Sequence, residues 1–135
     1  MVEEIRNYFI KNNIIDKSNR INVDFLGETP TEFSIMPIPV EPIIDKFING
    51  ASRCQFQFQL VSCNDYGAEV IQNIANSNFY EDLYNKITKY NKEKNLPDIN
   101  GIESIECLNN GAILTAGTKT ARYSIQMRII YFKEA

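Results

Sequence analysis

The sequence has no histidine, no tryptophan and only three cysteines among its 135 residues. A protein without histidine lacks the commonest general base, the Ser–His and Cys–His catalytic pairs and most transition-metal sites. Cys54, Cys63 and Cys107 are odd in number and show no CxxC spacing, which favours reduced thiols that pack as small hydrophobes over a disulfide framework. We therefore expect no catalytic residue, no metal and no cofactor.

A strong net charge and a long apolar run are missing as well. The net charge is −3, so the chain has no electrostatic footprint for duplex DNA or an anionic membrane. Three prolines and a glutamate interrupt the longest apolar stretch, IMPIPVEPII, and the opening MVEEI does not resemble a secretory signal. The length suits one compact domain, residues 1–135, and we expect that domain to be soluble and intracellular.

The clearest pattern that is present is the string CQFQFQL, which begins at Cys54. Apolar residues alternate with Gln55, Gln57 and Gln59, and this alternation predicts a half-buried strand over residues 53–62. The last strand, residues 120–132, alternates in the same way. Its predicted inward face is Tyr123, Ile125, Met127, Ile129 and Tyr131, and its predicted outward face is Arg122, Ser124, Gln126 and Arg128.

The rest of the chain predicts helices and shorter strands around these two. An amphipathic helix is expected over residues 1–12. Residues 21–27 and 32–36 are expected to form a hairpin, and a weak strand is expected over 101–108. Pro37, Pro39 and Pro42 predict a long, stiff connection through residue 51, with one helical turn over 43–48.

Residues 68–94 predict two helices that meet at an angle, because Asn78 and Glu81 have the spacing of a capping box. The second helix should turn Phe79, Leu83, Ile87 and Tyr90 inward. NNGAILTAGT, which begins at Asn109, should form an extended loop or a hairpin tip. The order is therefore α-β-β-loop-β-α-α-β-β, an α+β fold with a mostly antiparallel sheet backed by helices.

Two enzyme-like features have simpler explanations. GAILTAGTKT has five residues between Gly111 and Gly117, and Thr118 precedes the lysine, so the spacing differs from that of a phosphate-binding loop. The acidic pairs at Glu3 and Glu81 lie at predicted helix starts, where carboxylates interact with the helix dipole. An enzyme that uses carboxylates or thiols, or a small ligand-binding domain, remains the alternative function.

The outward polar residues indicate contact with another protein. Amides and arginine can be buried against a partner at less desolvation cost than lysine or glutamate. The competing interpretation is a sheet face covered by the chain's own loop or open to water. The candidate interface residues are Gln55, Gln57, Gln59, Pro37, Pro39, Pro42, Arg122, Gln126 and Arg128. The candidate mobile loop contains Asn109, Asn110, Gly111, Gly117 and Thr118.

Several strings occur together in the order and spacing of one protein family. They are VDFLGETPTEFSI followed by MPIPVEPI, DKFINGASRCQFQFQLVS, NIANSNFYEDLYNKI, NLPDI and ARYSIQMRIIYF. Over residues 5–132 the chain resembles the tail terminator proteins of tailed bacteriophages, which are often labelled minor capsid or head–tail joining proteins. Where members of that family often carry a tryptophan near the second helix, this chain has Tyr84.

The resemblance implies a virion structural protein that is assembled in the bacterial host cytoplasm and has no enzyme activity. Such proteins form a ring, expected here to be a hexamer, on the end of the tail tube. The ring stops tube polymerisation and presents the surface that docks to the head connector. Its partners would be copies of itself, the tube protein and the connector, while DNA only passes through the lumen and no membrane is involved.

Overall fold

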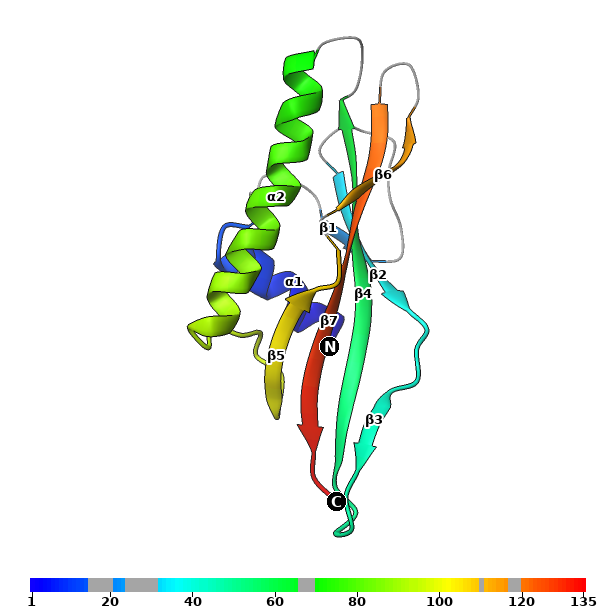
Figure 1. Ribbon diagram of the computed structural model, residues 1–135, viewed down its shortest axis with the longest axis vertical. Helices are drawn as coiled ribbons and strands as arrows, with labels where there is room; N and C mark the ends of the chain where they lie inside the picture. The colour runs from blue at the N-terminus through cyan, green and yellow to red at the C-terminus, as the bar shows by residue number, and fades with distance from the viewer. Residues whose placement is uncertain (15–20, 24–31, 66–69, 110, 117–119) are drawn as a thin grey trace.

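The computed structural model describes residues 1–14, 21–23, 32–65, 70–109, 111–116 and 120–135. Their order is α1 (Val2–Lys11), β1 (Ile21–Val23), β2 (Glu32–Ile38), β3 (Ile43–Lys46), β4 (Ser52–Asp65), α2 (Val70–Lys92), β5 (Ile102–Cys107), β6 (Ala112–Ala116) and β7 (Thr120–Lys133). One sheet contains all seven strands, and α1 and α2 pack beside it (Figure 1). The fold is α+β, as the sequence predicts.

The centre of the sheet is the pair β4 and β7, two strands of 14 residues that run antiparallel along their whole length. The strand order is β1-β2-β4-β7-β5, while β3 also pairs with β4 and β6 also pairs with β7. Every pairing is antiparallel except that of β1 with β2. The two alternating sequences that predicted strands therefore form the two central strands.

The alternation also predicts most of the buried side chains correctly, although Ser124, which was expected on the outward face, is buried as well. On β4 Phe58 and Leu60 are buried, and their register partners on β7 are Met127 and Ile125, which are buried too. These residues share one core cluster with buried residues of α1 and α2, including Phe9, whose ring centre lies 6.3 Å from that of Phe58. The helices therefore cover the face that carries the phenylalanines, and the glutamines of β4 lie on the opposite face.

The predicted hairpin between the first two strands is wrong. Ile21 pairs with Phe33 and Val23 with Ile35, so β1 and β2 run parallel. A parallel pair needs a connection that crosses back to the starting end, and a tight turn cannot provide it. The turn residues around Gly27 indicate a change of direction but do not specify where the chain returns.

The predicted break between two helices is also wrong, because α2 is continuous from Val70 to Lys92. Asn78 lies inside the helix and is exposed, so it does not act as an N-cap. Tyr80, Leu83 and Ile87 are buried at helical spacing just after it. Their packing extends one helix across a residue whose local preference is for a helix start.

The proline-rich connection contains more strand than the sequence predicts. Pro37 is in β2 opposite Phe58, and residues 43–46 form strand β3, where a helical turn was expected. Proline fits here because β1 pairs only with the residues of β2 from Phe33 to Ile35. β2 therefore has no strand partner beside Pro37 on the side away from β4, within the described part of the chain. The N–H group that proline lacks would face this side, so no hydrogen bond of the sheet is lost.

The two predicted C-terminal strands are present, but a third strand that the sequence analysis did not predict lies between them. β5 lies within the expected 101–108, and residues 112–116 form β6, which pairs antiparallel with β7 as the hairpin alternative requires. Residues 117–119, between β6 and β7 in sequence, lie outside the described residues. Among the described residues, no helix is both long and apolar enough to cross a membrane.

Candidate interaction surface

The candidate surface is the sheet face opposite the helices, where polar side chains from β4 and β7 lie next to one another. Gln57 pairs in register with Arg128, and Gln59 pairs with Gln126. Gln55, Gln57, Gln59, Gln126 and Arg128 are all half-buried. The structure thus brings five of the nine predicted interface residues together on one face, because residues directly opposite in an antiparallel pair share a face.

Part of this polar face serves the chain's own fold. The Gln55 side-chain amide donates to the Glu41 carbonyl at 2.9 Å, and the Gln55 backbone N–H donates to the Pro42 carbonyl at 2.8 Å. The Gln57 amide in turn donates to the Gln55 side-chain oxygen at 3.1 Å. Gln55 therefore fastens the connection between β2 and β3, as the interpretation of a face covered by the chain's own loop requires.

The charged residues of the same region form pairs. The Arg53 guanidinium donates to Glu103 at 3.1 Å and lies 3.4 Å from Asp45, and the partners of Arg53 raise its pKa, with the Glu103 hydrogen bond the largest cause. The Arg128 Nε donates to Glu106 of the neighbouring strand at 2.7 Å. Because opposite charges meet across the strands, a partner would cover this face without isolating an unpaired charge.

The three prolines lie on one border of the sheet and are not part of the polar face. Pro37, Pro39 and Pro42 are all exposed, the first in β2 and the others in the connection to β3. Arg122 is exposed near the start of β7, where it pairs in register with Cys63. The prolines remain candidates for contact but lie apart from the glutamines, whereas Arg122 shares the face of Gln126 and Arg128 and lies further along β7.

The candidate mobile loop is fixed at its first residues. The Asn109 side-chain oxygen accepts from the Gly111 N–H at 3.1 Å and from the Gln126 N–H at 3.2 Å. Gly111 has φ +84°, and a Cβ there would come within 2.9 Å of the Tyr80 Cβ. Asn110, Gly117 and Thr118 lie outside the described residues, so mobility of this loop stays a prediction.

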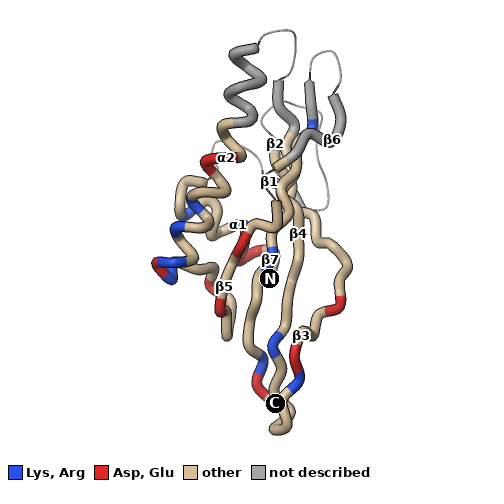
Figure 2. Tube along the Cα trace, viewed as in Figure 1, with Lys and Arg blue, Asp and Glu red and all other residues tan. Residues whose placement is uncertain are grey.

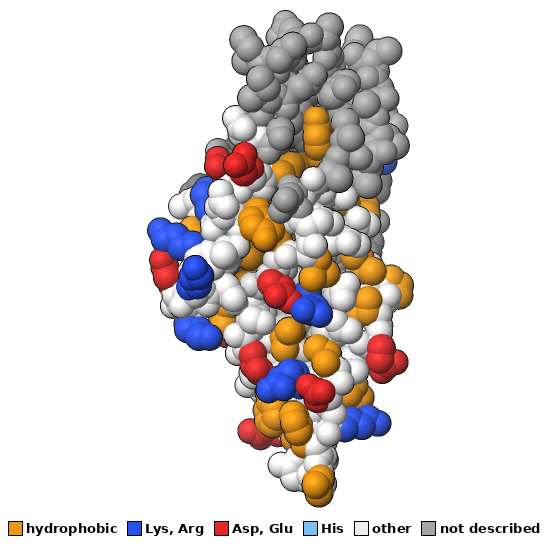
Figure 3. Space-filling view, viewed as in Figure 1, with side chains coloured by type: hydrophobic (Ala, Val, Ile, Leu, Met, Phe, Trp, Pro, Cys, Tyr) orange, Lys and Arg blue, Asp and Glu red, His pale blue; other side chains and the backbone are white. Residues whose placement is uncertain are grey.

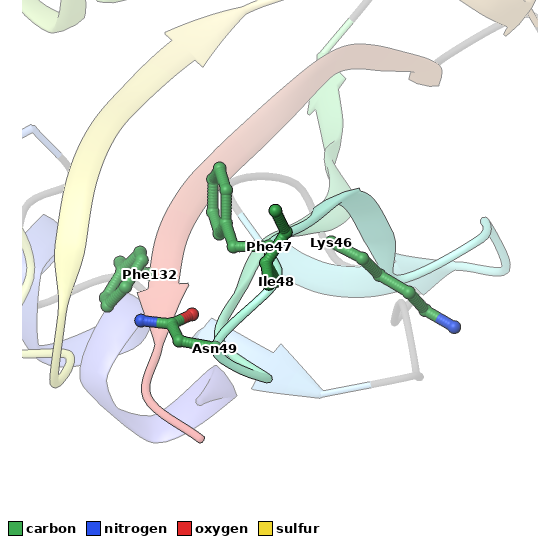
Figure 4. A pocket seen from close by; sticks show the side chains of 5 residues that line it. All are labelled: Lys46, Phe47, Ile48, Asn49 and Phe132. Atoms are coloured by element: carbon green, nitrogen blue, oxygen red, sulfur yellow. The ribbon is translucent and has the colours of Figure 1, made fainter.

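A second surface feature was missed by the sequence analysis: the β3–β4 hairpin ends in exposed apolar side chains. Ile48 is fully exposed, and Ile44 and Phe47 are exposed as well. A hollow of about 640 Å³ at this end is lined by Lys46, Phe47, Ile48, Asn49 and Phe132 (Figure 4). In the space-filling view hydrophobic side chains reach this end of the molecule (Figure 3).

The missed signal was the dipeptide Asn49-Gly50, a strong hairpin cue between apolar residues. Gly50 has φ +89°, a left-handed conformation that glycine adopts without strain. The Phe47 N–H donates to the Ala51 carbonyl at 2.9 Å, and the Gly50 N–H donates to the Phe47 carbonyl at 3.0 Å. Read in this way, the sequence would have predicted a hairpin instead of a helical turn over 43–48.

The described thiols do not have the features of a nucleophile. Burial, with a smaller effect of Glu106, raises the pKa of the Cys107 thiol to about 12, so this thiol stays protonated at neutral pH. Cys54 is buried beside Ser52, with 3.4 Å between Sγ and Oγ. Within the described ranges, no group of three or more cysteine, aspartate and glutamate side chains is placed to hold a metal ion.

Comparison of the sequence with protein-family models gives no match, and comparison with curated proteins gives no significant one.

Proposed function

We propose that this chain is a structural protein of a phage or prophage tail. It caps the tail tube as a ring, stops tube polymerisation and provides the surface that docks to the head. The observation that carries the proposal is the order of the sequence strings over residues 5–132, which resembles that of tail terminator proteins. An α+β domain with a mostly antiparallel sheet backed by helices is compatible with it.

The half-buried polar face supports a role in protein contact. Its arginines are paired with carboxylates and its amides are partly engaged, so another protein can cover it at modest desolvation cost. The exposed apolar end of the β3–β4 hairpin gives the domain a second contact surface. A ring subunit needs two different surfaces, one for each neighbour.

Deletion of the gene from its phage or prophage tests this proposal directly. After induction and lysis, negative-stain electron microscopy should show overlong or ragged tails together with filled heads that have not joined them. Reintroduction of the intact gene in trans should restore particles with tails of uniform length. Normal infectious particles from the deletion strain would contradict the proposal and would turn attention to a ligand-binding or enzymatic role.

A further inference from the structure

The segment 41–50, which we call the arm, carries most of the exposed apolar surface. Five large hydrophobic side chains are exposed among the described residues, and three of them, Ile44, Phe47 and Ile48, belong to the arm. Phe47 is held by Phe132, with ring centres 6.0 Å apart, and by the Arg53 guanidinium 5.8 Å from its ring. Ile48 is fully exposed, which leaves it available to enter a complementary hollow.

Helix α2 has such a hollow on its outer side, which we call the helix hollow. Its volume is about 500 Å³, and it is lined by Tyr84, Asn85, Thr88, Lys89, Lys92 and Glu93. Tyr84 is half-buried, while Lys89 and Lys92 are exposed. The hydrocarbon stems of lysines give such a hollow apolar walls and place positive charge at its rim.

The arm has more carboxylates than lysines, although Asp45 also pairs with Arg53 at 3.4 Å. The C-terminal end of α2 is rich in lysine and lies on a different side of the molecule from β3 (Figure 2). Residues 84–94 contain four lysines, all exposed, and one glutamate. The arm contains two exposed carboxylates, Glu41 and Asp45, and one lysine, Lys46. Each surface thus has an apolar centre and a charged border, and the two borders attract each other.

We propose that the arm of one copy docks into the helix hollow of a second copy of this chain. Ile48 enters the hollow, and the carboxylates of Glu41 and Asp45 face the lysines at its rim. Contact through two different surfaces is head-to-tail, so repeated association closes into a ring when the rotation between copies permits it. This inference rests on the proposed function in one respect, since it assigns the subunit contact of the proposed ring.

Charge reversal on the purified full-length chain tests the contact. The arm variant is Glu41→Lys with Asp45→Lys, the helix variant is Lys89→Glu with Lys92→Glu, and a third chain carries all four changes. Sedimentation velocity over a concentration series should show wild-type self-association that weakens as salt is added. Each two-residue variant should associate at least about tenfold more weakly, and the chain with all four changes should recover association because both borders are reversed.

A matched control changes the charge by the same amount outside both surfaces. Glu3→Lys with Asp98→Lys alters two exposed carboxylates, one on α1 and one before β5, and should associate almost as the wild type does. Ile48→Ser removes the apolar side chain without adding a charge and should also weaken association. Circular dichroism confirms that each variant is folded before its association is measured.

Several results would overturn the inference. They are a wild-type chain that stays monomeric throughout the series, variants that associate like the wild type, and failure of the four changes to restore association. None of these results decides the proposed function, because tail length in the deletion strain is measured without reference to these surfaces. Normal particles from that strain would reject the proposed function even if purified copies associated through the arm.

Discussion

The Asn91 side-chain oxygen on helix α2 accepts a hydrogen bond from the backbone N–H of Ile105 in strand β5, at 3.1 Å. β5 is an edge strand of the sheet, and the Ile105 side chain is completely buried. A buried N–H on an edge strand needs a partner, and an unpaired edge invites pairing with other chains. Asn91 satisfies this donor and covers part of the edge.

We expect Asn91→Ala to lower the free energy of unfolding by about 1–3 kcal/mol, because the Ile105 N–H would stay buried without a partner. Urea denaturation followed by circular dichroism measures the change. The control is Asn85→Ala, an exposed position on the same helix, which should change stability by less than about 0.5 kcal/mol. Equal stability of the two variants would show that water replaces Asn91.

Gly101 should be much less tolerant of alanine than Gly50. Both have positive φ, +78° and +89°, so both substitutions strain the backbone alike. A Cβ on Gly101 would lie 2.1 Å from the Phe132 carbonyl oxygen, which is backbone, whereas on Gly50 it would lie 3.1 Å from the Ala135 Cβ. Gly50→Ala should cost about 1–3 kcal/mol, and Gly101→Ala should cost clearly more. Thermal melts of both variants provide the comparison, and similar melting temperatures would contradict it.

Stability should fall as pH rises above about 9. Burial raises the pKa of Cys107 from 9.0 to about 12 and also raises the pKa of Tyr8 and Tyr80 from 10.0. Between the unfolded and folded pKa values the unfolded chain loses protons that the folded chain keeps. Each group therefore lowers the free energy of unfolding by up to about 1.4 kcal/mol per pH unit between its unfolded and folded pKa values. Below its unfolded pKa value, the group has no effect on stability.

Urea midpoints measured from pH 7 to pH 11 test this dependence. Cys107→Ala should reduce the slope between pH 9 and pH 10, where the thiol is the first of the three groups to ionise in the unfolded chain. The control is Asn85→Ala, an exposed change on α2 that removes no titratable group and should leave the slope unchanged. A pH-independent midpoint would show that these groups ionise equally in the folded and unfolded states.

Gln57→Lys should leave the monomer folded and should weaken assembly. Gln57 lies opposite Arg128 in the register, so a lysine there adds a like charge and should cost less than about 1 kcal/mol. If a partner covers the polar face, the buried ammonium would be far more costly in the complex than in the monomer. Tail morphology after complementation of the deletion strain measures assembly.

Asn7→Lys is the control for this experiment, because Asn7 is exposed on α1 and away from the polar face. It should complement the deletion as the wild-type gene does. A Gln57→Lys chain that fails to fold, with no selective defect in assembly, would count against the polar face as an interface.

Local sequence patterns predict those parts of this fold that depend on local geometry. Alternation identifies β4 and β7 and their buried faces, because successive side chains of a strand must point to opposite sides. The continuity of α2 through Asn78 and the parallel pairing of β1 with β2 depend on contacts distant in sequence. A capping signal or a turn signal carries no information about those contacts.

The same limit applies to the candidate surface. Gln55, Gln57 and Gln59 were assigned correctly to one face, but the hydrogen bond from Gln55 to Glu41 could not be foreseen without the path of the β2–β3 connection. The helix hollow combines residues from three successive turns of α2, and its lysines resemble an ordinary solvated helix end in sequence. Only the three-dimensional structure relates that helix end to the arm on a different side of the molecule.

The long pairing of β4 with β7 has a consequence for how quickly the chain folds. Ser52 pairs with Lys133 and Asp65 with Thr120, so α2 and two other strands lie between the two partners in sequence. Contacts between distant segments form only after a large loop has closed, and the chain loses conformational entropy in that step before the contacts stabilise it. This order slows folding. A newly made chain would therefore expose its alternating strands for longer than a helical bundle of the same length, and the central ladder could form only after β7 has been synthesised.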